Sequence, residues 1–366
     1  MSAIKLDYVC FLNHSGYSQA AQNMIFALSQ NPDYDIKLTM FGDRPNRPAV
    51  SDENYEIFMK MLKKPEDSKR IVVYHCVPHL QKKAKKPNQR SIGFGTFETF
   101  QPPEHWARVL NENDAVIAPS LFNQKIFKHE GVNSPIYYIP HCLDFSKYNR
   151  KVLPMYQYDK YTFLFMGIWR ERKGFKPLIE AWLREFSDDD SVQLVIKTDK
   201  PKKAGQYVEQ MKKEVGLNKG FAPVIFENKV FDEKDLPRFI KSVDCLISPT
   251  MGEGFGYPGL QCMALGIPVA ITNFSGCQDY ANEETAILIE PSAFVLKEDM
   301  DRIPQFRNKK WAFVEVKKVR RVLRRIAERP VEARIKVSTA HNYVKRNFSY
   351  ERIENLFTQM VRELYG

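Results

Sequence analysis

The sequence predicts an α/β protein composed of two doubly wound domains, each with a parallel sheet covered by helices. Short apolar, β-branched or aromatic runs alternate with amphipathic stretches along most of the chain, and this alternation is typical of strand–helix–strand units. A chain of 366 residues is also longer than one ordinary hydrophobic core requires. The segment 144–161 is rich in proline, tyrosine and charge and interrupts the alternation, so we place the interdomain linker in it.

Each domain is predicted from its own series of strands. In the N-terminal domain, residues 1–150, we expect strands at 5–12, 36–41, 71–75, 91–97, 115–119 and 136–139, with helices at 19–29, 54–63, 104–111 and 122–130. In the second domain, residues 151–340, we expect strands at 162–166, 193–197, 224–226, 245–248, 269–272 and 287–289, with helices at 175–185 and 235–241. Residues 341–366 have the apolar spacing of an amphipathic helix, which we expect to cross back to the N-terminal domain.

Composition and charge narrow the class of protein. No run of about 18 apolar residues is present, and the first residues lead directly into a strand-like segment, so we expect a cytoplasmic protein. The six cysteines are scattered without a Cys-x-x-Cys pair, so neither a zinc site nor a disulfide framework is expected. A net charge of +11 favours an anionic partner. A nucleoside diphosphate, an acidic glycan, the inner face of a membrane and a nucleic acid all remain open.

Two basic segments bear on these partners. The loop at 81–90 carries five Lys or Arg residues and suits phosphates or anionic lipid, with a solvated charged loop as the alternative. The basic helix at 317–325 keeps an apolar stripe at Val319, Val322 and Leu323, and we expect that stripe to pack against the protein.

A glycine-rich turn after a strand carries the main chemical signal. The strand at 245–248 leads into Pro-Thr-Met-Gly-Glu-Gly-Phe-Gly-Tyr-Pro, and a helix is expected from Pro258. Glycine lets the backbone approach a ligand, and a helix N-terminus offers free N–H groups to an anion. A tight connection without a ligand is the alternative interpretation. The residues expected to contact a ligand here are Glu253, Gly254, Phe255, Gly256, Tyr257, Pro258 and, one turn inside the helix, Gln261.

This segment resembles the retaining glycosyltransferases of family 4, which have the GT-B fold and a Glu-x7-Glu motif. The resemblance implies two Rossmann-like domains that face each other across a cleft. In the family, the first Glu contacts the donor sugar and the second binds the nucleotide ribose. Glu253 matches the first, whereas Gln261 stands in the second position. An amide keeps an acceptor oxygen but lacks the negative charge, so ribose binding is expected to be weaker or differently specified.

A second segment resembles the same family. Phe-Met-Gly-Ile-Trp-Arg-Glu-Arg-Lys-Gly, residues 165–174, is similar to the family's loop that carries an Arg/Lys pair on the donor diphosphate, which implies that role for Arg172 and Lys173. Ile168 stands where the family has an Arg, and Arg170 or Arg172 is expected to replace it. Two cations stabilise the charge that develops as the sugar–phosphate bond breaks, so no metal or other cofactor is expected.

Further donor contacts are expected where other strands end. The loop containing Gly16 stands where the family has a glycine-rich loop facing the phosphates, and a plain strand-to-helix turn is the alternative. Lys197 and Thr198 end one strand of the second domain, and Lys229 and Val230 follow the next. All four are expected to flank the nucleotide pocket.

Three residues of the N-terminal domain are candidates for the cleft or the acceptor. Glu98 lies in Thr-Phe-Glu-Thr, which resembles a subgroup of the family and implies a place near the reacting sugar. His14 lies in the loop after the first strand, and His75 ends the strand at 71–75. For His75, a buried structural role is the alternative.

The resemblance implies a transferase that moves a hexose-type sugar from a UDP-sugar or GDP-sugar to a hydroxyl of a glycan or lipid-linked sugar. Retention of the anomeric configuration is implied with it. Two alternatives remain open. One is a glycosyltransferase that decorates a modified base in DNA, and the other is a catalytically weakened nucleotide-sugar-binding protein, suggested by Gln261 and Ile168.

Overall fold

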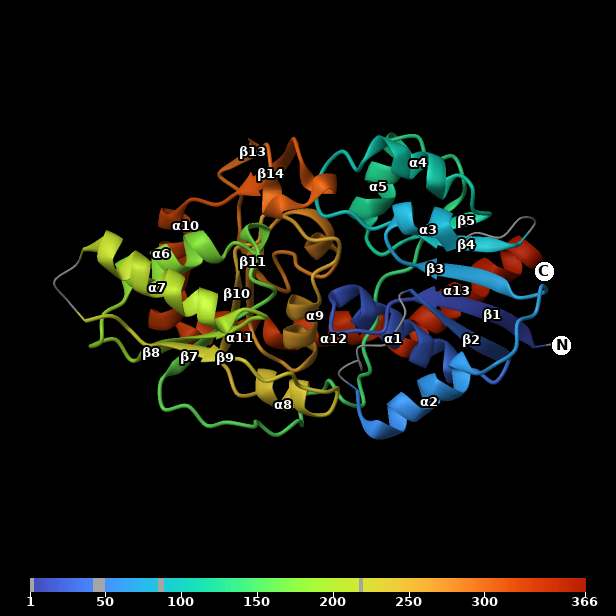
Figure 1. The fold of residues 1–366 in the computed structure, drawn as a ribbon. Helices are drawn as coiled ribbons and strands as arrows, with labels where there is room; N and C mark the ends of the chain where they lie inside the picture. The colour runs from blue at the N-terminus through green and yellow to red at the C-terminus, as the bar shows by residue number, and fades with distance from the viewer. Residues whose placement is uncertain (1–2, 42–49, 85–88, 217–219) are drawn as a thin grey trace.

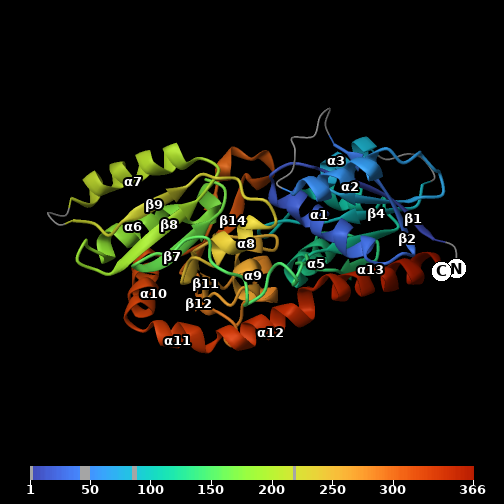
Figure 2. The same ribbon diagram turned by 90° about the horizontal axis from the view of Figure 1, so that it is seen from below.

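The computed structural model describes residues 3–41, 50–84, 89–216 and 220–366 as two α/β halves side by side (Figures 1 and 2). The N-terminal half has a six-stranded parallel sheet in the order β2-β1-β3-β4-β5-β6. Its strands are β1 (Ile4–Cys10), β2 (Tyr34–Met40), β3 (Ile71–His75), β4 (Ser91–Phe94), β5 (Ala115–Ala118) and β6 (Ile136–Tyr138). Its helices are α1 (Gly16–Ser29), α2 (Asp52–Leu62), α3 (Pro78–Ala84), α4 (Glu104–Leu110) and α5 (Leu121–His129).

The C-terminal half has a second parallel sheet of six strands, in the order β12-β11-β10-β7-β8-β9. Its strands are β7 (Tyr161–Met166), β8 (Val192–Lys197), β9 (Val224–Glu227), β10 (Cys245–Ser248), β11 (Val269–Thr272) and β12 (Ile287–Ile289). Its helices are α6 (Phe175–Glu185), α7 (Pro201–Val215), α8 (Asp235–Ile240), α9 (Tyr257–Ala264), α10 (Val316–Glu328) and α11 (Pro330–Ile335). Short 3-10 turns add η1 (Glu171–Lys173) and η2 (Ser275–Asp279).

The predicted fold class is confirmed. All twelve strands that the apolar runs predicted are present, because these runs supply side chains for sheets buried on both faces. The helices α3, α7 and α11 and the two strands after β12 were not among the predicted elements. The helix α7 has few apolar residues, and the segment after β12 folds into a two-stranded antiparallel sheet of β13 (Ala293–Lys297) and β14 (Lys309–Phe313), joined by η3 (Met300–Arg302) and η4 (Pro304–Phe306).

The end of the chain passes from one half to the other. The helix α12 (Val337–Phe348) packs on α9, and α13 (Tyr350–Tyr365) packs on α1 of the N-terminal half (Figure 2). Ser349 separates the two helices, because its backbone is extended and its side chain accepts a hydrogen bond from the Arg352 amide. None of the helices in the described residues is long and apolar enough to cross a membrane. All six cysteines are buried and free.

Carboxylates of the C-terminal half cap helices of the N-terminal half. The Glu233 carboxylate accepts hydrogen bonds from the Ser51 amide and the Asn54 side chain, both at 2.8 Å, at the start of α2. The Asp279 carboxylate accepts the Leu121 amide at 3.0 Å, at the start of α5. Because these caps satisfy free N–H groups of one half with acceptors of the other, they favour the closed arrangement.

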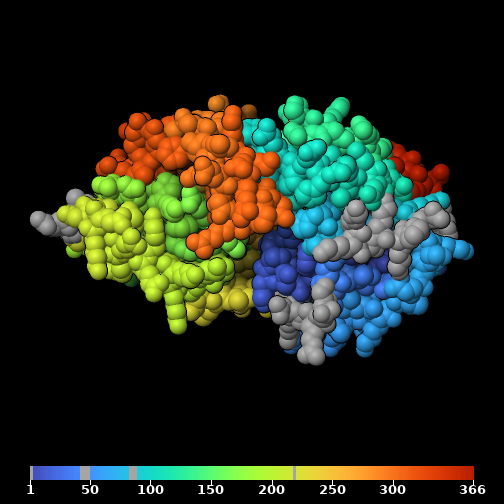
Figure 3. Space-filling view, turned by 45° about the horizontal axis from the view of Figure 1, so that its top comes forward, coloured from blue at the N-terminus to red at the C-terminus, as the bar shows by residue number. Residues whose placement is uncertain are grey.

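The segment between β12 and α10 also reaches the N-terminal half. The Thr99 hydroxyl donates to the Lys310 carbonyl, and the Phe100 ring lies 5.4 Å from that of Phe294. Figure 3 shows this orange segment abutting the cyan and teal surface of the N-terminal half. The two halves therefore meet along caps, an aromatic contact and the crossing C-terminal helices.

The cap at Asp279 predicts a pH dependence of stability. Burial raises the pKa of Asp279 to about 6, although hydrogen bonds from Leu121 and Tyr138 act to lower it. Since the folded pKa lies above the ordinary value of 3.8, folding is favoured most when the group is protonated, and stability falls as pH rises through about 6. This single group accounts for a loss of about 3 kcal/mol between about pH 4 and pH 7.

Urea unfolding of the wild type and of Asp279→Asn across this range is the measurement. The side chain that Asp279→Asn introduces cannot ionise, so we expect the free energy of unfolding of the variant to rise relative to that of the wild type as pH rises. Two stability curves that stay parallel between about pH 4 and pH 7 would contradict this account of Asp279.

Candidate functional site

Four of the candidate residues meet near the carboxyl ends of the two central strands of the C-terminal sheet. The strands β7 and β10 are neighbours, and the order of strands reverses between them. In doubly wound sheets ligands bind at such a switch point. The loop after β7 carries Arg172 and Lys173, and the loop after β10 carries Glu253. Glu98, which follows β4, approaches from the N-terminal half.

Glu253 is the centre of this site and is only 7% exposed. The Lys173 ammonium donates to both of its carboxylate oxygens, at 2.6 and 2.8 Å, and Arg172 donates to one of them at 3.3 Å. The Glu253 amide donates to the Ser275 hydroxyl at 2.8 Å. Burial would raise the pKa of Glu253, but the charges of Lys173 and Arg172 hold it below its ordinary value. Glu253 is therefore a buried, ionised acceptor.

Arg172 contacts three carboxyl groups that come from separate parts of the chain. Its guanidinium lies 3.3 Å from Glu253 and 3.3 Å from Glu98 of the N-terminal half. Its Nε lies 3.8 Å from an Asp301 carboxylate oxygen. It also donates to the Gly252 carbonyl at 3.2 Å. The arginine thus links the two central loops to both the N-terminal half and the segment between β13 and β14.

The site has more carboxyl groups than cations. Glu98, Glu253 and Asp301 face two cations, Arg172 and Lys173. Burial raises the pKa of Glu98 and of Asp301, and the charge of Arg172 offsets this only in part. The group most able to take up a proton is consequently Glu98 or Asp301, whereas Glu253 stays ionised. Over the described ranges of the chain, no group of three or more His, Cys, Asp or Glu side chains is arranged to hold a metal ion.

Asp301 was not identified from the sequence. Its carboxylate accepts the Glu171 amide at 2.6 Å, and its carbonyl accepts Arg170 at 2.8 Å. Its backbone has a φ of 57°, in the left-handed region that costs a non-glycine residue energy. Asp301 thus holds the loop before Arg172 by three contacts. It lies about 130 residues away in sequence, and no local pattern marks it.

The turn before α9 is built around glycines. Gly256 has a φ of 90°, and a Cβ there would lie 2.7 Å from the Tyr280 hydroxyl oxygen, which donates to the Gly256 carbonyl. A Cβ on Gly254 would overlap the Thr96 side chain, and the Gly254 carbonyl accepts from Asn123 at 3.1 Å. Pro258 lies in the first turn of α9. The predicted turn and helix start are therefore present, packed closely against the N-terminal half.

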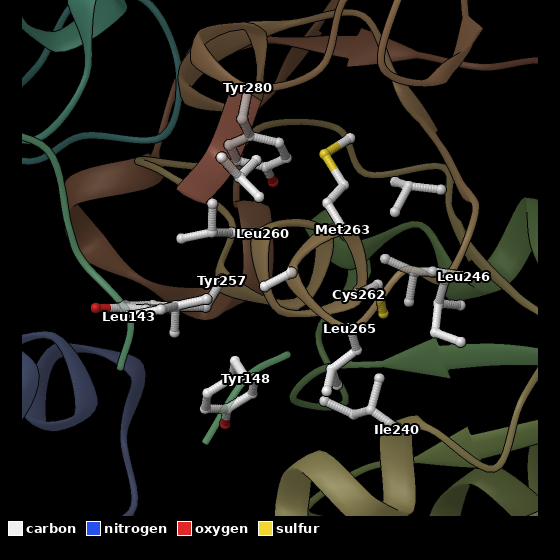
Figure 4. Packing of buried hydrophobic residues seen from close by; sticks show 14 of the residues in the cluster. Leu143, Tyr148, Ile240, Leu246, Tyr257, Leu260, Cys262, Met263, Leu265 and Tyr280 are labelled. Carbon is white, nitrogen blue, oxygen red and sulfur yellow. The ribbon is translucent and has the colours of Figure 1, made fainter. Parts of the chain in front are cut away.

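Aromatic side chains surround α9. Phe255 and Tyr257 are buried, and the Tyr257 hydroxyl donates to the Cys142 carbonyl at 3.2 Å. Figure 4 shows Tyr257, Leu260, Cys262, Met263 and Leu265 packed among side chains of neighbouring elements. Because the helix is fixed on most sides, the position of its N-terminus is fixed with it.

Gln261 faces the interior. It is 1% exposed, and its side-chain amide donates to the hydroxyl of Tyr148 at 3.1 Å. Tyr148 belongs to the cluster in Figure 4. Tyr148 belongs to the linker before β7, so the direction of Gln261 depends on a residue far away in sequence. In this arrangement the amide has its partner within the protein.

The expected nucleotide residues gather at the ends of β8 and β9. The Lys197 ammonium donates to the Lys229 carbonyl at 2.6 Å and lies 5.2 Å from the centre of the Phe231 ring. Thr198 is buried, whereas Val230 is 66% exposed. These residues form one neighbourhood beside the central strands, as their places at strand ends predict.

The N-terminal candidates divide into two groups. Gly16 is exposed at the start of α1, and a Cβ there would meet nothing within 4 Å. His14 is exposed in the same loop. Figure 3 shows a hollow at the boundary of the two halves next to the dark-blue residues at the start of the chain. This loop is open to a ligand.

His75 instead lies in the interior rather than at a ligand-facing edge. It is 1% exposed, its Nδ1 lies 2.6 Å from the Tyr8 hydroxyl, and its ring stacks on Phe94 at 3.8 Å. Burial holds its pKa well below the ordinary value. His141 is buried beside it, and burial lowers its pKa to about 3. His75 therefore has the buried position that the sequence left open as the alternative, rather than a position at the cleft.

Comparisons with known proteins support the fold and locate a family similarity in the C-terminal half. Residues 160–301 match the family model described as "Glycosyl transferases group 1", a range that includes both central loops. No curated protein matches the chain. Sequence comparison alone thus places the similarity in the C-terminal half.

Solved structures with the same fold cover nearly the whole chain. HepE from Anabaena, crystallised with UDP and glucose, is 13% identical, with a TM-score of 0.71 over 98% of this chain and 100% of that one. Sucrose-phosphate synthase from Thermosynechococcus elongatus is 15% identical, with a TM-score of 0.69 over 99% of each chain. A glycosyltransferase from Rickettsia africae is 14% identical, with a TM-score of 0.70 over 100% of this chain and 99% of that one. The chain therefore has the GT-B fold.

Gly174 offers a test of how the two central loops pack. Its φ is 79°, and an added Cβ would overlap the Pro249 carbonyl of the neighbouring loop. We expect Gly174→Ala to destabilise the protein by about 2 kcal/mol or more in urea unfolding. The matched control is Gly205→Ala in α7, where a Cβ would only touch Phe226 at 3.8 Å. The control should be stabilised by about 0.5–1 kcal/mol, and equal stabilities for the two variants would contradict the loop packing.

Proposed function

We propose that this protein is a glycosyltransferase that moves a hexose-type sugar from a nucleoside diphosphate sugar to a hydroxyl group, with retention of configuration and without a metal ion. The observation that carries the proposal is the ionised Glu253 held by Lys173 and Arg172 at the switch point of a GT-B fold. The group 1 glycosyltransferase match over residues 160–301 supports it.

The charges suit the donor. A carboxylate such as Glu253 accepts hydrogen bonds from sugar hydroxyls. Arg172 and Lys173 carry the positive charge that a departing diphosphate needs, and the positive end of α9, which no side chain caps, adds to it. Each cation already has a carboxylate partner, so a bound diphosphate would share these cations with Glu253. The acceptor then attacks on the face that the diphosphate leaves, and the diphosphate assists its deprotonation.

The donor is proposed to be a UDP-sugar or a GDP-sugar. Uridine donors are supported by analogy, since the HepE structures contain UDP or UDP-glucose. Lys197, Thr198, Lys229 and Val230 are proposed to line the nucleotide pocket, with Gly16 facing the phosphates. The acceptor is proposed to be a glycan or a lipid-linked sugar, bound beside Glu98 and His14 of the N-terminal half.

A second candidate is a nucleotide-sugar-binding protein with little catalytic activity. The observation that favours it is the direction of Gln261, whose amide is paired with Tyr148 inside the protein. Donor hydrolysis distinguishes the two candidates, because a transferase cleaves its donor slowly in water and a binding protein does not.

A thermal-shift panel of UDP-, GDP-, ADP- and CMP-sugars tests the proposal first. A ligand present at 100 times its dissociation constant stabilises the folded state by about 2.7 kcal/mol. We expect a UDP-sugar or a GDP-sugar to raise the melting temperature and then to be hydrolysed. No response to any donor would overturn the proposed function.

The variant Glu253→Gln tests the role of the carboxylate. Glu253→Ala would leave Lys173 and Arg172 with a buried gap, whereas Gln keeps the shape and one acceptor oxygen. We expect donor cleavage to fall by about 100-fold or more, because the ionised acceptor is lost. The matched control is the exposed Glu284→Gln, which should keep full activity. Near-normal activity in a folded Glu253→Gln variant would exclude this site assignment.

A further inference from the structure

One face of the C-terminal half has a concentrated positive charge that the proposed reaction does not use. The segment 316–335, which forms α10 and α11, carries eight Lys or Arg residues and two Glu residues, a net charge of +6. The whole chain has a net charge of +11. More than half of the excess positive charge thus lies on two adjacent helices.

The helix α10 is anchored by part of this charge and presents the rest outward. Arg320 and Arg324 each donate to Glu185 at 2.8 Å, and Arg324 also contacts Asp190 at 2.9 Å. On the inner side Val319, Leu323 and Ile326 are buried in the core. The apolar stripe predicted for this helix therefore does pack, and it fixes which side of the helix faces out.

The outward side is a row of cations at helical spacing. Lys317, Arg321, Arg325 and Arg329 follow one another every four residues, and all four are exposed. Arg325 and Arg329 share a single carboxylate, Glu332. Together with the Glu185 region, this side of α10 borders a surface groove of about 520 Å³. Anionic groups can therefore approach several cations at once.

Exposed aliphatic side chains lie directly after the row. Val331 is 74% exposed and Ile335 is 73% exposed, and they are four residues apart on α11. A row of cations followed by exposed aliphatic residues is the chemistry of a surface that meets lipid headgroups and inserts a shallow apolar anchor. The segment 316–335 contains no aromatic residue, Asn or Gln, so it lacks the rings that stack on bases and the amides that pair with adenine.

We propose that α10 and α11 form a docking face for an anionic phospholipid membrane. The cations bind the headgroups, and Val331 and Ile335 enter the interface. Figures 1 and 2 both place α10 on the C-terminal half, away from the boundary with the N-terminal half. The loop at His14 and Gly16 therefore stays accessible while the protein is docked.

The test is co-sedimentation of the full-length protein with vesicles of phosphatidylcholine alone or of equal parts phosphatidylcholine and phosphatidylglycerol. We expect binding only to the anionic vesicles, weakened by salt. Arg321→Glu/Arg325→Glu should reduce binding by at least about tenfold. The matched control, Lys202→Glu/Lys203→Glu, makes the same change of charge at exposed residues of α7 and should bind like the wild type. Val331→Ser/Ile335→Ser should weaken the part of the binding that survives at high salt.

Several results would overturn the proposal. One is equal binding to both vesicle types, and another is an equal loss of vesicle binding in the α10 and α7 variants. A third is binding to a DNA duplex that depends on Arg321 and Arg325, without binding to vesicles. Melting temperatures establish that each variant is folded, and Arg321→Gln/Arg325→Gln replaces the charge reversal if that variant unfolds. Donor binding in the thermal-shift assay should be the same in all folded variants, so failure of this inference is distinguishable from failure of the proposed function.

Discussion

The contact between the Glu253 carboxylate and the Lys173 ammonium is the interaction on which the rest of the site depends. It joins the loops after β7 and β10 through two hydrogen bonds, at 2.6 and 2.8 Å. A backbone hydrogen bond also joins the two loops, because the Arg172 carbonyl accepts a hydrogen bond from the Met251 amide at 2.7 Å. A buried carboxylate is costly unless it is paired, so these loops cannot separate without leaving a charge unpaired.

The N-terminal half and the segment between β13 and β14 add carboxyl groups next to this ion pair. Each supplies one carboxyl group to Arg172, Glu98 from one side and Asp301 from the other. The caps at Glu233 and Asp279 hold the halves close enough for Glu98 to reach. The electrostatics of the site and the closure of the two halves are therefore coupled, because a change in one alters the partners of Arg172 in the other.

Local pattern predicted the sheets, because buried strands are apolar runs, and the glycine-rich turn after one strand marked Glu253. Arg172 and Lys173, about 80 residues away in sequence, were identified by the resemblance to a known family, and the structure places Lys173 beside Glu253. What was not predicted depends on distant partners. Asp301, between β13 and β14, accepts a hydrogen bond from the loop after β7. The Gln261 amide pairs with Tyr148 in the linker. His75 contacts Tyr8 and Phe94 in the core. Hydrophobic periodicity predicts which face of a strand is buried, but it does not predict which distant residue a side chain at the end of the strand will contact.

A crystal structure of the protein with a UDP-sugar or a GDP-sugar tests the central claim most directly, that the loops joined by Glu253 and Lys173 hold the donor. The account predicts that the diphosphate lies against Lys173, Arg172 and the N-terminus of α9, with a sugar hydroxyl on the Glu253 carboxylate. A donor bound elsewhere, with the contact between Glu253 and Lys173 undisturbed and no phosphate beside it, would contradict the account.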